Sequence, residues 1–227
     1  MQNSKLIIFD MDGLLLDSEK LALDAFESTC AKFKLGDLVY IYMKCIGTNW
    51  ELANLILKDE FEGIMDHEEF ILIWDRVYND LTQEKPIPLK KGAKQLLDHI
   101  DSMGIQMAVA SSTNTESAKS ILTQSGILYY FDLIIGGEQV SNSKPNPEVY
   151  LKVASTLGVN PEFCIALEDS PNGVKSAVAA NMKVIQIPDL NQPDESLLQL
   201  GHIVLNSLSD VISYDFGKHD TRQNITN

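Results

Sequence analysis

Acidic, hydroxyl and lysine side chains stand at the ends of four short apolar runs of the sequence, or shortly after them. Carboxylates that gather in one place repel one another, so they need a cation to neutralise them. Mg²⁺ prefers oxygen ligands of this kind and usually keeps waters and a substrate phosphate. The residue types therefore predict a magnesium site that handles a phosphorylated compound. The residues concerned are Asp10, Asp12, Ser111, Ser112, Lys144, Glu168 and Asp169.

Each of these residues, taken alone, has an ordinary structural explanation. An acidic residue such as Asp169 often caps a helix, and the Ser111-Ser112-Thr113-Asn114 segment could do the same. A lone lysine before a proline, such as Lys144, is usually solvated. The site hypothesis therefore depends on whether the fold brings these residues together.

The apolar runs are typical of strands in a parallel sheet. Each is too short for a helix and too continuous for a half-exposed strand, which indicates burial on both faces. Amphipathic stretches lie between them, so the pattern predicts a doubly wound α/β fold. Carboxyl ends of parallel strands meet at one edge, where ligands bind in such sheets. The predicted strands are residues 6–9, 105–110, 133–135, 164–167, 184–187 and 202–205.

A long helical stretch interrupts the alternation after the first predicted strand. We expect residues 18–85 to form an all-helical cap domain, with Ser18 capping its first helix. The Lys85-Pro86-Ile87-Pro88 segment is a predicted hinge back to the core. The core domain would then comprise residues 1–17 and 86–213, followed by a polar tail at 214–227. A cap that leaves from this edge is placed to cover the site as a lid.

Composition narrows the class of protein. The chain has 227 residues, 18 Lys or Arg and 32 Asp or Glu, which gives a formal net charge of −14. We therefore expect no nucleic-acid or anionic-membrane partner. No apolar run reaches the roughly 18 residues of a membrane helix, and the first residues lack signal-peptide features. The three cysteines show no CxxC spacing, so the cytoplasm is the expected location. Protein partners and oligomeric state cannot be read from the sequence.

The arrangement of motifs closely resembles the haloacid dehalogenase-like hydrolase superfamily over about residues 5–212. The segment from Asp10 to Glu19 has the form DxDGxLxDSE, and the other motifs follow in the same order. The resemblance implies a Rossmann-like core with the helical cap of the β-phosphoglucomutase-like and phosphoglycolate-phosphatase-like branch. The other matching segments are Ala110-Ser111-Ser112, Ser143-Lys144-Pro145-Asn146-Pro147 and Leu167-Glu168-Asp169-Ser170-Pro171-Asn172-Gly173.

The resemblance also implies a role for each site residue. Asp10 would be the nucleophile that forms an aspartyl phosphate, and Asp12 the general acid and then base. Phosphoryl oxygens would bind to Ser111, Ser112 and Lys144. Mg²⁺ would be held by Asp10, the carbonyl of Asp12, Asp169, and Glu168 directly or through water. The implied activity is Mg²⁺-dependent hydrolysis of a small phosphorylated metabolite, such as a sugar phosphate.

A phosphomutase of the β-phosphoglucomutase type is the main alternative. In that pattern a histidine of the first cap helix and an arginine of a Gly-x-x-Arg loop assist the transfer. Counted without gaps from Asp10, Ala22 stands at the histidine position, and Trp50 stands at the arginine position after Gly47. These departures favour a phosphatase. The residues that could select the substrate are Lys20, Lys44, Asn49, Trp50 and Arg76.

Three other classes fit the sequence less well. A haloalkanoate dehalogenase would not need an acid at Asp12. In a receiver-type phospho-aspartate switch the phosphorylated residue follows the third strand, whereas Asp10 follows the first. A catalytically idle scaffold would be expected to lack some of the site residues, and all of them are present.

Overall fold

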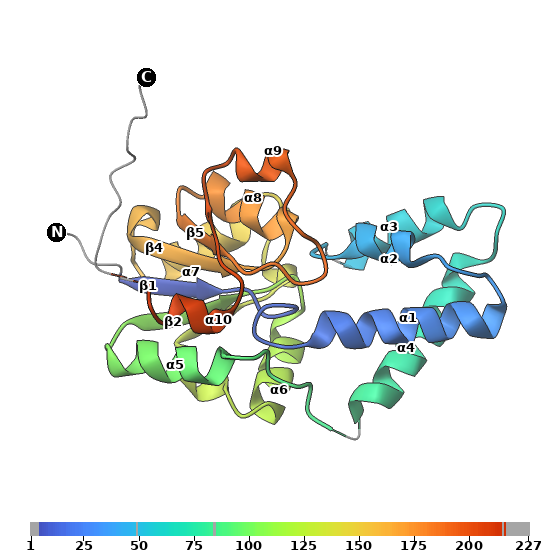
Figure 1. Ribbon diagram of the computed structural model, residues 1–227, viewed down its shortest axis with the longest axis horizontal. Helices are drawn as coiled ribbons and strands as arrows, with labels where there is room; N and C mark the ends of the chain where they lie inside the picture. Colours follow the sequence, from blue (N-terminus) through green and yellow to red (C-terminus); the bar gives the residue numbers. More distant parts are fainter. Residues whose placement is uncertain (1–4, 49, 84, 215, 217–227) are drawn as a thin grey trace.

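A computed structural model describes residues 5–48, 50–83, 85–214 and 216. Figure 1 shows two parts, a layered α/β core and a group of helices beside it. The carboxyl end of the first strand points towards these helices. None of the helices in the described part of the chain is both long and apolar enough to cross a membrane.

Six parallel strands form the sheet, in the order β3-β2-β1-β4-β5-β6. The central strand β1 pairs with β2 on one side and β4 on the other, with Leu6 opposite both Gln106 and Cys164. The doubly wound fold class that the sequence predicts is thereby confirmed. The strands are β1 (Leu6–Phe9), β2 (Gln106–Ala110), β3 (Leu133–Ile135), β4 (Cys164–Glu168), β5 (Lys183–Gln186) and β6 (Ile203–Val204).

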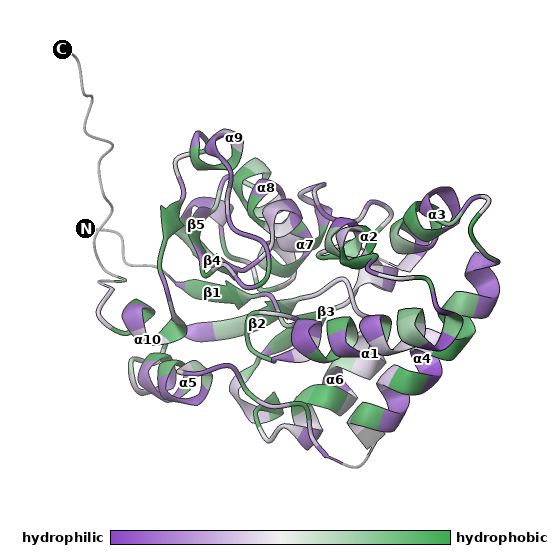
Figure 2. Cartoon of the chain, turned by 45° about the vertical axis from the view of Figure 1, so that its right-hand side comes forward, coloured by the Kyte–Doolittle hydropathy of each residue, from purple (hydrophilic) through white to green (hydrophobic). Residues whose placement is uncertain are grey.

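Helices lie on both faces of the sheet, as the ribbon in Figure 2 shows. Alternate residues of β1 serve opposite faces: Ile7 and Phe9 belong to one apolar cluster, Leu6 and Ile8 to the other. Because all four are fully buried, this strand reads as a continuous apolar run. The first face carries α5 (Ala93–Ser102), α6 (Thr115–Gln124) and α10 (Leu208–Val211), and the second carries α7 (Glu148–Thr156), α8 (Pro171–Ala179) and α9 (Glu195–Leu198).

Short 3₁₀ turns complete the core, and four helices form the cap. The 3₁₀ turns are η1 (Leu128–Tyr130), η2 (Gly137–Gln139) and η3 (Pro161–Phe163). The cap helices are α1 (Ser18–Phe33), α2 (Val39–Cys45), α3 (Trp50–Glu60) and α4 (His67–Gln83).

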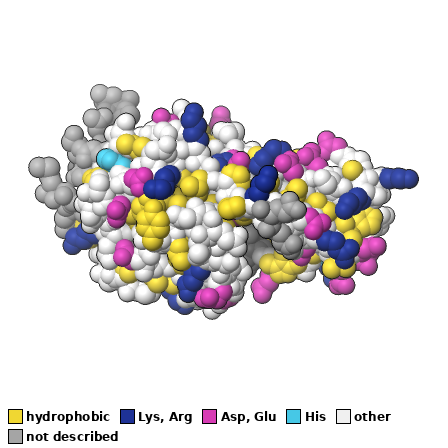
Figure 3. Space-filling view, turned by 90° about the horizontal axis from the view of Figure 1, so that it is seen from below, with side chains coloured by type: hydrophobic (Ala, Val, Ile, Leu, Met, Phe, Trp, Pro, Cys, Tyr) yellow, Lys and Arg dark blue, Asp and Glu magenta, His cyan; other side chains and the backbone are white. Residues whose placement is uncertain are grey.

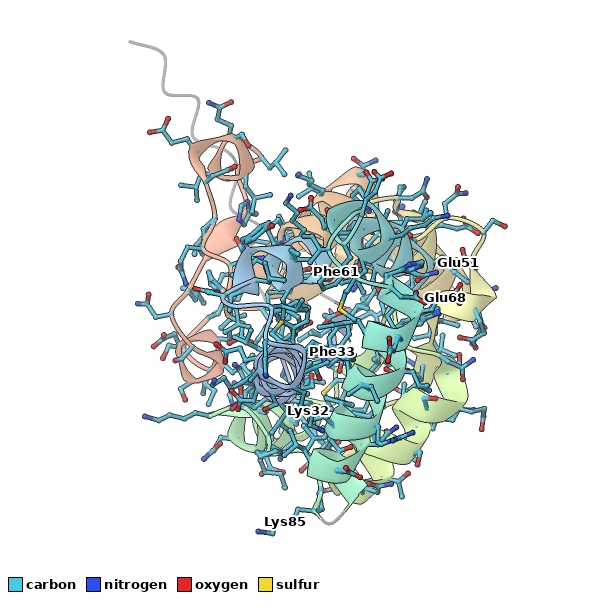
Figure 4. All side chains as sticks on the ribbon, turned by 90° about the vertical axis from the view of Figure 1, so that its right-hand side faces the viewer. Lys32, Phe33, Glu51, Phe61, Glu68 and Lys85 are labelled. Atoms are coloured by element: carbon cyan, nitrogen blue, oxygen red, sulfur yellow. The ribbon has the colours of Figure 1, made fainter. Side chains whose placement is uncertain are left out.

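An aromatic cluster holds the cap together independently of the sheet. The rings of Phe26 and Phe70 are 5.1 Å apart, and Trp74 packs edge-on against Phe26 at 5.5 Å. The Trp74 indole N–H also donates to the carbonyl of Ala22 at 3.0 Å, which ties α4 to α1. Figure 4 looks onto the end of the cap, where Phe33 and Phe61 are labelled.

The two crossings between core and cap run side by side. Leu16 and Leu89 form an antiparallel bridge, and the Asp17 N–H donates to the Pro88 carbonyl at 2.9 Å. Lys90 forms ion pairs with Asp17 at 3.1 Å and Asp189 at 2.5 Å. The four cap helices lie between the two sides of this paired stem, and the exact domain bounds stay a prediction.

Three local predictions need correction. Ser18 does not cap α1, because its hydroxyl donates to the Asp12 carboxylate at 2.8 Å. Helices α2, α9 and α10 were not predicted, since they are short and lack a full amphipathic period. Tyr214 and Phe216, placed in the polar tail, pack against the core, and Phe216 is 3% exposed. The rest of the tail lies outside the described residues.

The surface differs in character from the core. On the face that Figure 3 shows, acidic and basic side chains are interspersed over both the core and the cap. The large apolar side chains that remain exposed include Trp50 of α3, which is 53% exposed. Trp50 is therefore neither part of the aromatic cluster nor fully buried.

Candidate active site

The predicted site residues converge at the carboxyl edge of the sheet because backbone bonds extend the strand pairing past the strand ends. The Asp10 N–H donates to the Leu167 carbonyl at 3.0 Å, and the Ser111 N–H donates to the Ile135 carbonyl at 3.0 Å. Asp10 and Ser111 are therefore placed as firmly as the strands that they follow.

Lys144 lies at the centre of this group and is almost completely buried, with 2% of its surface exposed. Its ammonium donates to Asp10 Oδ1 at 2.5 Å, to Glu168 Oε1 at 2.7 Å and to the Ala110 carbonyl at 3.0 Å. Burial lowers the pKa of Lys144, but the charges of Asp10 and Glu168 outweigh it and hold the pKa above its ordinary value. Lys144 is therefore a fixed cation beside the Asp10 carboxylate.

Glu168 serves mainly as an anchor. Its Oε1 accepts from Lys144 and from the Tyr150 hydroxyl, the latter at 2.6 Å. Its Oε2 accepts from the Asp169 N–H at 3.1 Å and from the Ser170 N–H at 3.3 Å. Both oxygens are thus occupied, so a direct bond from Glu168 to a metal would have to replace one of these contacts.

The LEDSxxG segment packs tightly around this anchor. A Cβ placed on Gly173 would lie 1.8 Å from Glu168 Oε1, so only glycine fits at that position. Ser170 caps α8, because its hydroxyl accepts from the Gly173 N–H at 3.1 Å. The start of α8 is therefore locked to the carboxylate that holds Lys144.

Asp169 offers the clearest opening for a metal ligand. Its Oδ1 is buried and has no hydrogen-bond partner among the described residues. Carboxylate oxygens of Asp10, Glu168 and Asp169 all lie within 4.8 Å of one another. Burial, together with the neighbouring carboxylates, raises the pKa of both Asp10 and Asp169 well above the ordinary value. Three carboxylates face one lysine, and a hard divalent cation fits this donor set.

Gly13 allows the first loop to approach this cluster. Its φ is +81°, and a Cβ there would lie 2.4 Å from Asp169 Oδ2. Any other residue would therefore be strained and would displace Asp169. The glycine of the DxDG motif thus brings the loop that carries Asp12 against the carboxylate cluster.

The Asp12 carboxylate is not part of that cluster and lies in a clamp of two hydroxyls. Ser18 donates to its Oδ1 at 2.8 Å, and Thr113 donates to its Oδ2 at 2.8 Å. Asp12 thus has its own hydrogen-bond partners, which Asp10 and Asp169 do not share, as a different chemical role would require. The roles of Thr113 and Ser18 were not predicted, because each acts across a long or unpatterned sequence separation.

The hydroxyl segment after β2 forms a turn at the start of α6. The Thr113 N–H donates to the hydroxyl of Ser111 at 3.0 Å, and Ser111 is 1% exposed. Asn114 caps α6 by accepting from the N–H groups of Glu116 and Ser117. Ser112 lines the adjoining cavity, whereas Ser111 lies beneath it.

A cavity of about 310 Å³ lies between this edge and the cap. The cap comes close to the core there, since a Cβ on Gly47, whose φ is +72°, would lie 2.7 Å from the Ser170 hydroxyl. Residues of both the core and the cap line the cavity. The core contributes Asp10, Asp12, Ser112, Thr113, Asn114, Lys144, Asp169 and Ser170, and the cap contributes Glu19, Gly47, Thr48, Trp50 and Ala53.

Most of the suggested substrate-selecting residues do not line the cavity. Trp50 does, but Lys20 and Lys44 form ion pairs with Asp24 and Glu60 on the cap surface. Arg76 is exposed, and it is not among the residues that line the cavity. The fifth predicted residue, Asn49, lies outside the described residues.

Two further residues of the site were missed by the sequence analysis. The Tyr150 hydroxyl holds Glu168, and the sequence analysis assigned Tyr150 no role in the site. Glu19 lines the cavity and accepts from the Tyr42 hydroxyl at 2.5 Å. Burial, together with the charges of Asp12 and Asp189, raises the pKa of Glu19 to about 7, against the opposing effects of the Tyr42 hydroxyl and of Lys90.

Replacing Glu19 by Gln should change how stability depends on pH. The folded protein holds the Glu19 proton up to about pH 7, whereas the ordinary pKa is 4.5. The stability that this proton contributes is present below pH 4.5 and is lost as the pH rises through 7. Relative to wild type, Glu19→Gln should therefore gain about 2–3 kcal/mol in the free energy of unfolding between pH 5 and pH 8.

Urea denaturation in metal-free buffer at the two pH values would measure this difference. Glu27→Gln is the matched control, since Glu27 is exposed on the same helix. The control should follow the wild-type curve. Parallel curves for wild type and Glu19→Gln would show that Glu19 does not titrate in this range.

The chain is similar in sequence and fold to known proteins over most of its length. The family model described as haloacid dehalogenase-like hydrolase matches residues 7–187. A phosphorylated carbohydrates phosphatase of Thermotoga maritima is 30% identical over 217 residues, covering 91% of this chain and 96% of the relative. Hexitol phosphatase B of Escherichia coli is 29% identical over 216 residues, covering 92% of this chain and 94% of that protein.

A solved structure described as a putative beta-phosphoglucomutase from Thermotoga maritima has a TM-score of 0.73 at 27% sequence identity. The match covers 92% of this chain and 97% of that one. These similarities extend over core and cap alike. From its motifs, its fold and these relatives, the chain belongs to the haloacid dehalogenase-like hydrolases and is a phosphatase of that family.

Proposed function

We propose that the enzyme is a Mg²⁺-dependent phosphatase that hydrolyses a small sugar or polyol phosphate through an aspartyl-phosphate intermediate. The observation that carries this proposal is Lys144, buried between Asp10 and Glu168 beside the unpartnered oxygen of Asp169. One cavity is thus lined by the proposed nucleophile Asp10, by the ammonium of Lys144 and by Asp169, which has an oxygen available for a metal.

Asp10 would attack the phosphorus atom, forming a bond from a carboxylate oxygen as the bond to the leaving oxygen breaks. Lys144 holds the Asp10 carboxylate in one orientation and places positive charge where the phosphoryl oxygens would gather. Ser112, on the cavity wall, would bind those oxygens, and Ser111 supports the turn that carries it. Water would then release phosphate from Asp10.

Mg²⁺ would be held by Asp10, Asp169 and the carbonyl of Asp12, with Glu168 behind them. When bound, it would shield the negative charge of the phosphate from the attacking carboxylate. The raised pKa values of Asp10 and Asp169 support this, because these carboxylates need either a proton or a cation nearby.

Asp12 would protonate the leaving oxygen and afterwards accept a proton from the attacking water. The hydroxyls of Ser18 and Thr113 hold both of its oxygens, so its carboxyl group has a defined direction. Ser18 begins the first cap helix, whereas Thr113 belongs to the core. The clamp therefore couples the orientation of the general acid to the position of the cap.

A phosphomutase remains the alternative that the putative beta-phosphoglucomutase structure raises. Transfer between hydroxyls requires that the phosphoenzyme meets an activated acceptor and not water. Ala22 has no titratable group, and its side chain packs against the apolar cluster of the cap. Trp50 lines the cavity but cannot clamp a second phosphate as a guanidinium would. Water should therefore complete the second half-reaction.

³¹P NMR of a hexose phosphate should show release of inorganic phosphate in the presence of Mg²⁺. We expect no isomeric sugar phosphate when β-glucose 1-phosphate is supplied with a trace of the bisphosphate primer. Chelation should stop the reaction, and added Mg²⁺ should restore it. Glucose 6-phosphate appearing faster than free phosphate would favour the mutase, and full activity in excess chelator would contradict the role of the metal.

A further inference from the structure

We propose that Glu19 is a specificity-determining residue of this site, which binds a hydroxyl of the leaving group and rejects a leaving group that carries a second negative charge. The preferred substrates would then be monophosphates of uncharged polyols or sugars. The inference rests on the proposed phosphatase function and extends it to the part of the substrate that leaves.

Glu19 lies where the leaving group must be. It is the second residue of α1, and it lines the same cavity as Asp12, the proposed acid that protonates the leaving oxygen. Besides Gly47, the cap side of this cavity is formed by Thr48, Trp50 and Ala53. A group bonded to the leaving oxygen would therefore extend from Asp12 towards Glu19 and these three residues.

Tyr42 of α2 holds the Glu19 carboxyl in place. Its hydroxyl lies 2.5 Å from Glu19 Oε2 and 2.9 Å from the Glu19 carbonyl oxygen. Tyr42 is 2% exposed, and its ring packs against Phe26 at 5.6 Å and Trp74 at 6.0 Å. The carboxyl group is thus positioned by the aromatic cluster of the cap and not by solvent.

One oxygen of the Glu19 carboxyl group, Oε1, is available to a ligand. Tyr42 engages Oε2, and no described residue forms a hydrogen bond with Glu19 Oε1. A carboxyl oxygen in a cavity wall is well suited to a hydroxyl, which can both donate and accept. Because a hydroxyl can play either part, the contact can form whether or not Glu19 carries a proton.

The charges in the cavity disfavour an anionic leaving group. Asp10, Asp12, Glu19 and Asp169 line it, and Lys144 is the only basic side chain among its described lining residues. Lys144 is already paired with Asp10 and Glu168. A carboxylate or a second phosphate on the leaving group would therefore meet Glu19 and Asp12 without a cation of its own.

Other charged groups near Glu19 do not change this balance. Asp189 and Lys90 both act on it, but Lys90 is bound to Asp17 and Asp189 in an ion-pair group at the stem. These two carboxylates largely compensate the Lys90 charge, so it adds little positive potential in the cavity. An uncharged, hydroxyl-bearing group is the chemistry that this wall accommodates best.

The test compares three esters with wild type, Glu19→Gln and the exposed control Glu27→Gln. The three esters differ in their leaving group. That of sorbitol 6-phosphate is an uncharged polyol, that of phosphoglycolate carries a carboxylate, and that of p-nitrophenyl phosphate has no further hydroxyl group. Wild type should prefer sorbitol 6-phosphate. In Glu19→Gln, the ratio of kcat/KM for sorbitol 6-phosphate to kcat/KM for phosphoglycolate should fall about tenfold or more.

Hydrolysis of p-nitrophenyl phosphate should stay within about twofold of wild type in Glu27→Gln, and in Glu19→Gln it should change less than hydrolysis of sorbitol 6-phosphate. An unchanged ratio in Glu19→Gln, or an equal loss on all three esters, would overturn the specificity role while leaving the phosphatase intact. Failure of the wild-type enzyme to hydrolyse any of the three would instead overturn the proposed function and this inference with it.

Tyr42→Phe provides a second variant should Glu19→Gln fail to fold, as judged by circular dichroism. It keeps the buried ring and all the carboxylates but removes the hydroxyl that positions Glu19. The same kcat/KM ratio should fall about threefold, mainly through a higher KM for sorbitol 6-phosphate. An unchanged ratio in this variant would count against the proposal.

Discussion

Asp10→Asn is expected to reduce turnover by at least about 10³-fold while the protein stays folded. An amide cannot form the aspartyl phosphate, whatever its position. Lys144 keeps its bond to Glu168, so no buried charge loses its last partner. Without metal, the variant should be at least as stable as wild type, because one carboxylate is removed from a repelling group.

Phosphate release and thermal unfolding would be measured together for this variant. Asp101→Asn is the matched control, since Asp101 is exposed on α5. It should leave activity and stability unchanged. If Asp10→Asn kept more than a few per cent of wild-type turnover after mass spectrometry had excluded deamidation, the covalent mechanism would be wrong.

Lys144→Met is expected to damage both stability and turnover. It leaves the Asp10 and Glu168 carboxylates buried without the ammonium that bridges them. Removing one partner from a buried ionic group typically costs about 3–5 kcal/mol in the free energy of unfolding. Turnover should fall at least about 10²-fold, because positive charge beside the phosphoryl group is lost.

Urea denaturation would give the change in stability, and phosphate release the change in turnover. Lys91→Met removes an exposed lysine near the stem and should match wild type in both measurements. A Lys144→Met protein as stable as wild type would mean that Asp10 and Glu168 do not depend on the lysine. Undiminished turnover would remove Lys144 from the proposed mechanism.

Much of the fold could be predicted because its central strands are buried on both faces. Burial of this kind requires continuous apolar residues, so residues 6–9 and 164–167 stand out in the sequence. Parallel pairing then places whatever follows each strand at one edge. That is why Asp10, Ser111 and Asp169 could be assigned to a common site before any contact between them was known.

The structure of the cap was harder to predict from the sequence, because short or partly exposed helices leave only a weak hydrophobic periodicity. Helix α2 has seven residues and was not predicted, yet it supplies Tyr42. Likewise, Ser18 suits a helix cap by residue type and sequence position, but its hydroxyl bonds to Asp12 in the folded chain. A local rule predicts what a side chain can do, whereas the folded chain decides which available partner it meets.

The sequence by itself determined the doubly wound core, the inserted helices and the convergence of the acidic, hydroxyl and lysine residues at one edge. Only the tertiary structure decided the contacts that define their chemistry. Thr113 reaches Asp12 across 101 residues, Tyr42 reaches Glu19 across 23, and Tyr150 reaches Glu168 across 18. Strand burial and helix periodicity repeat along the chain and leave a pattern in it. A single hydrogen bond between distant side chains leaves no such pattern, because it depends on how the cap and the sheet pack together.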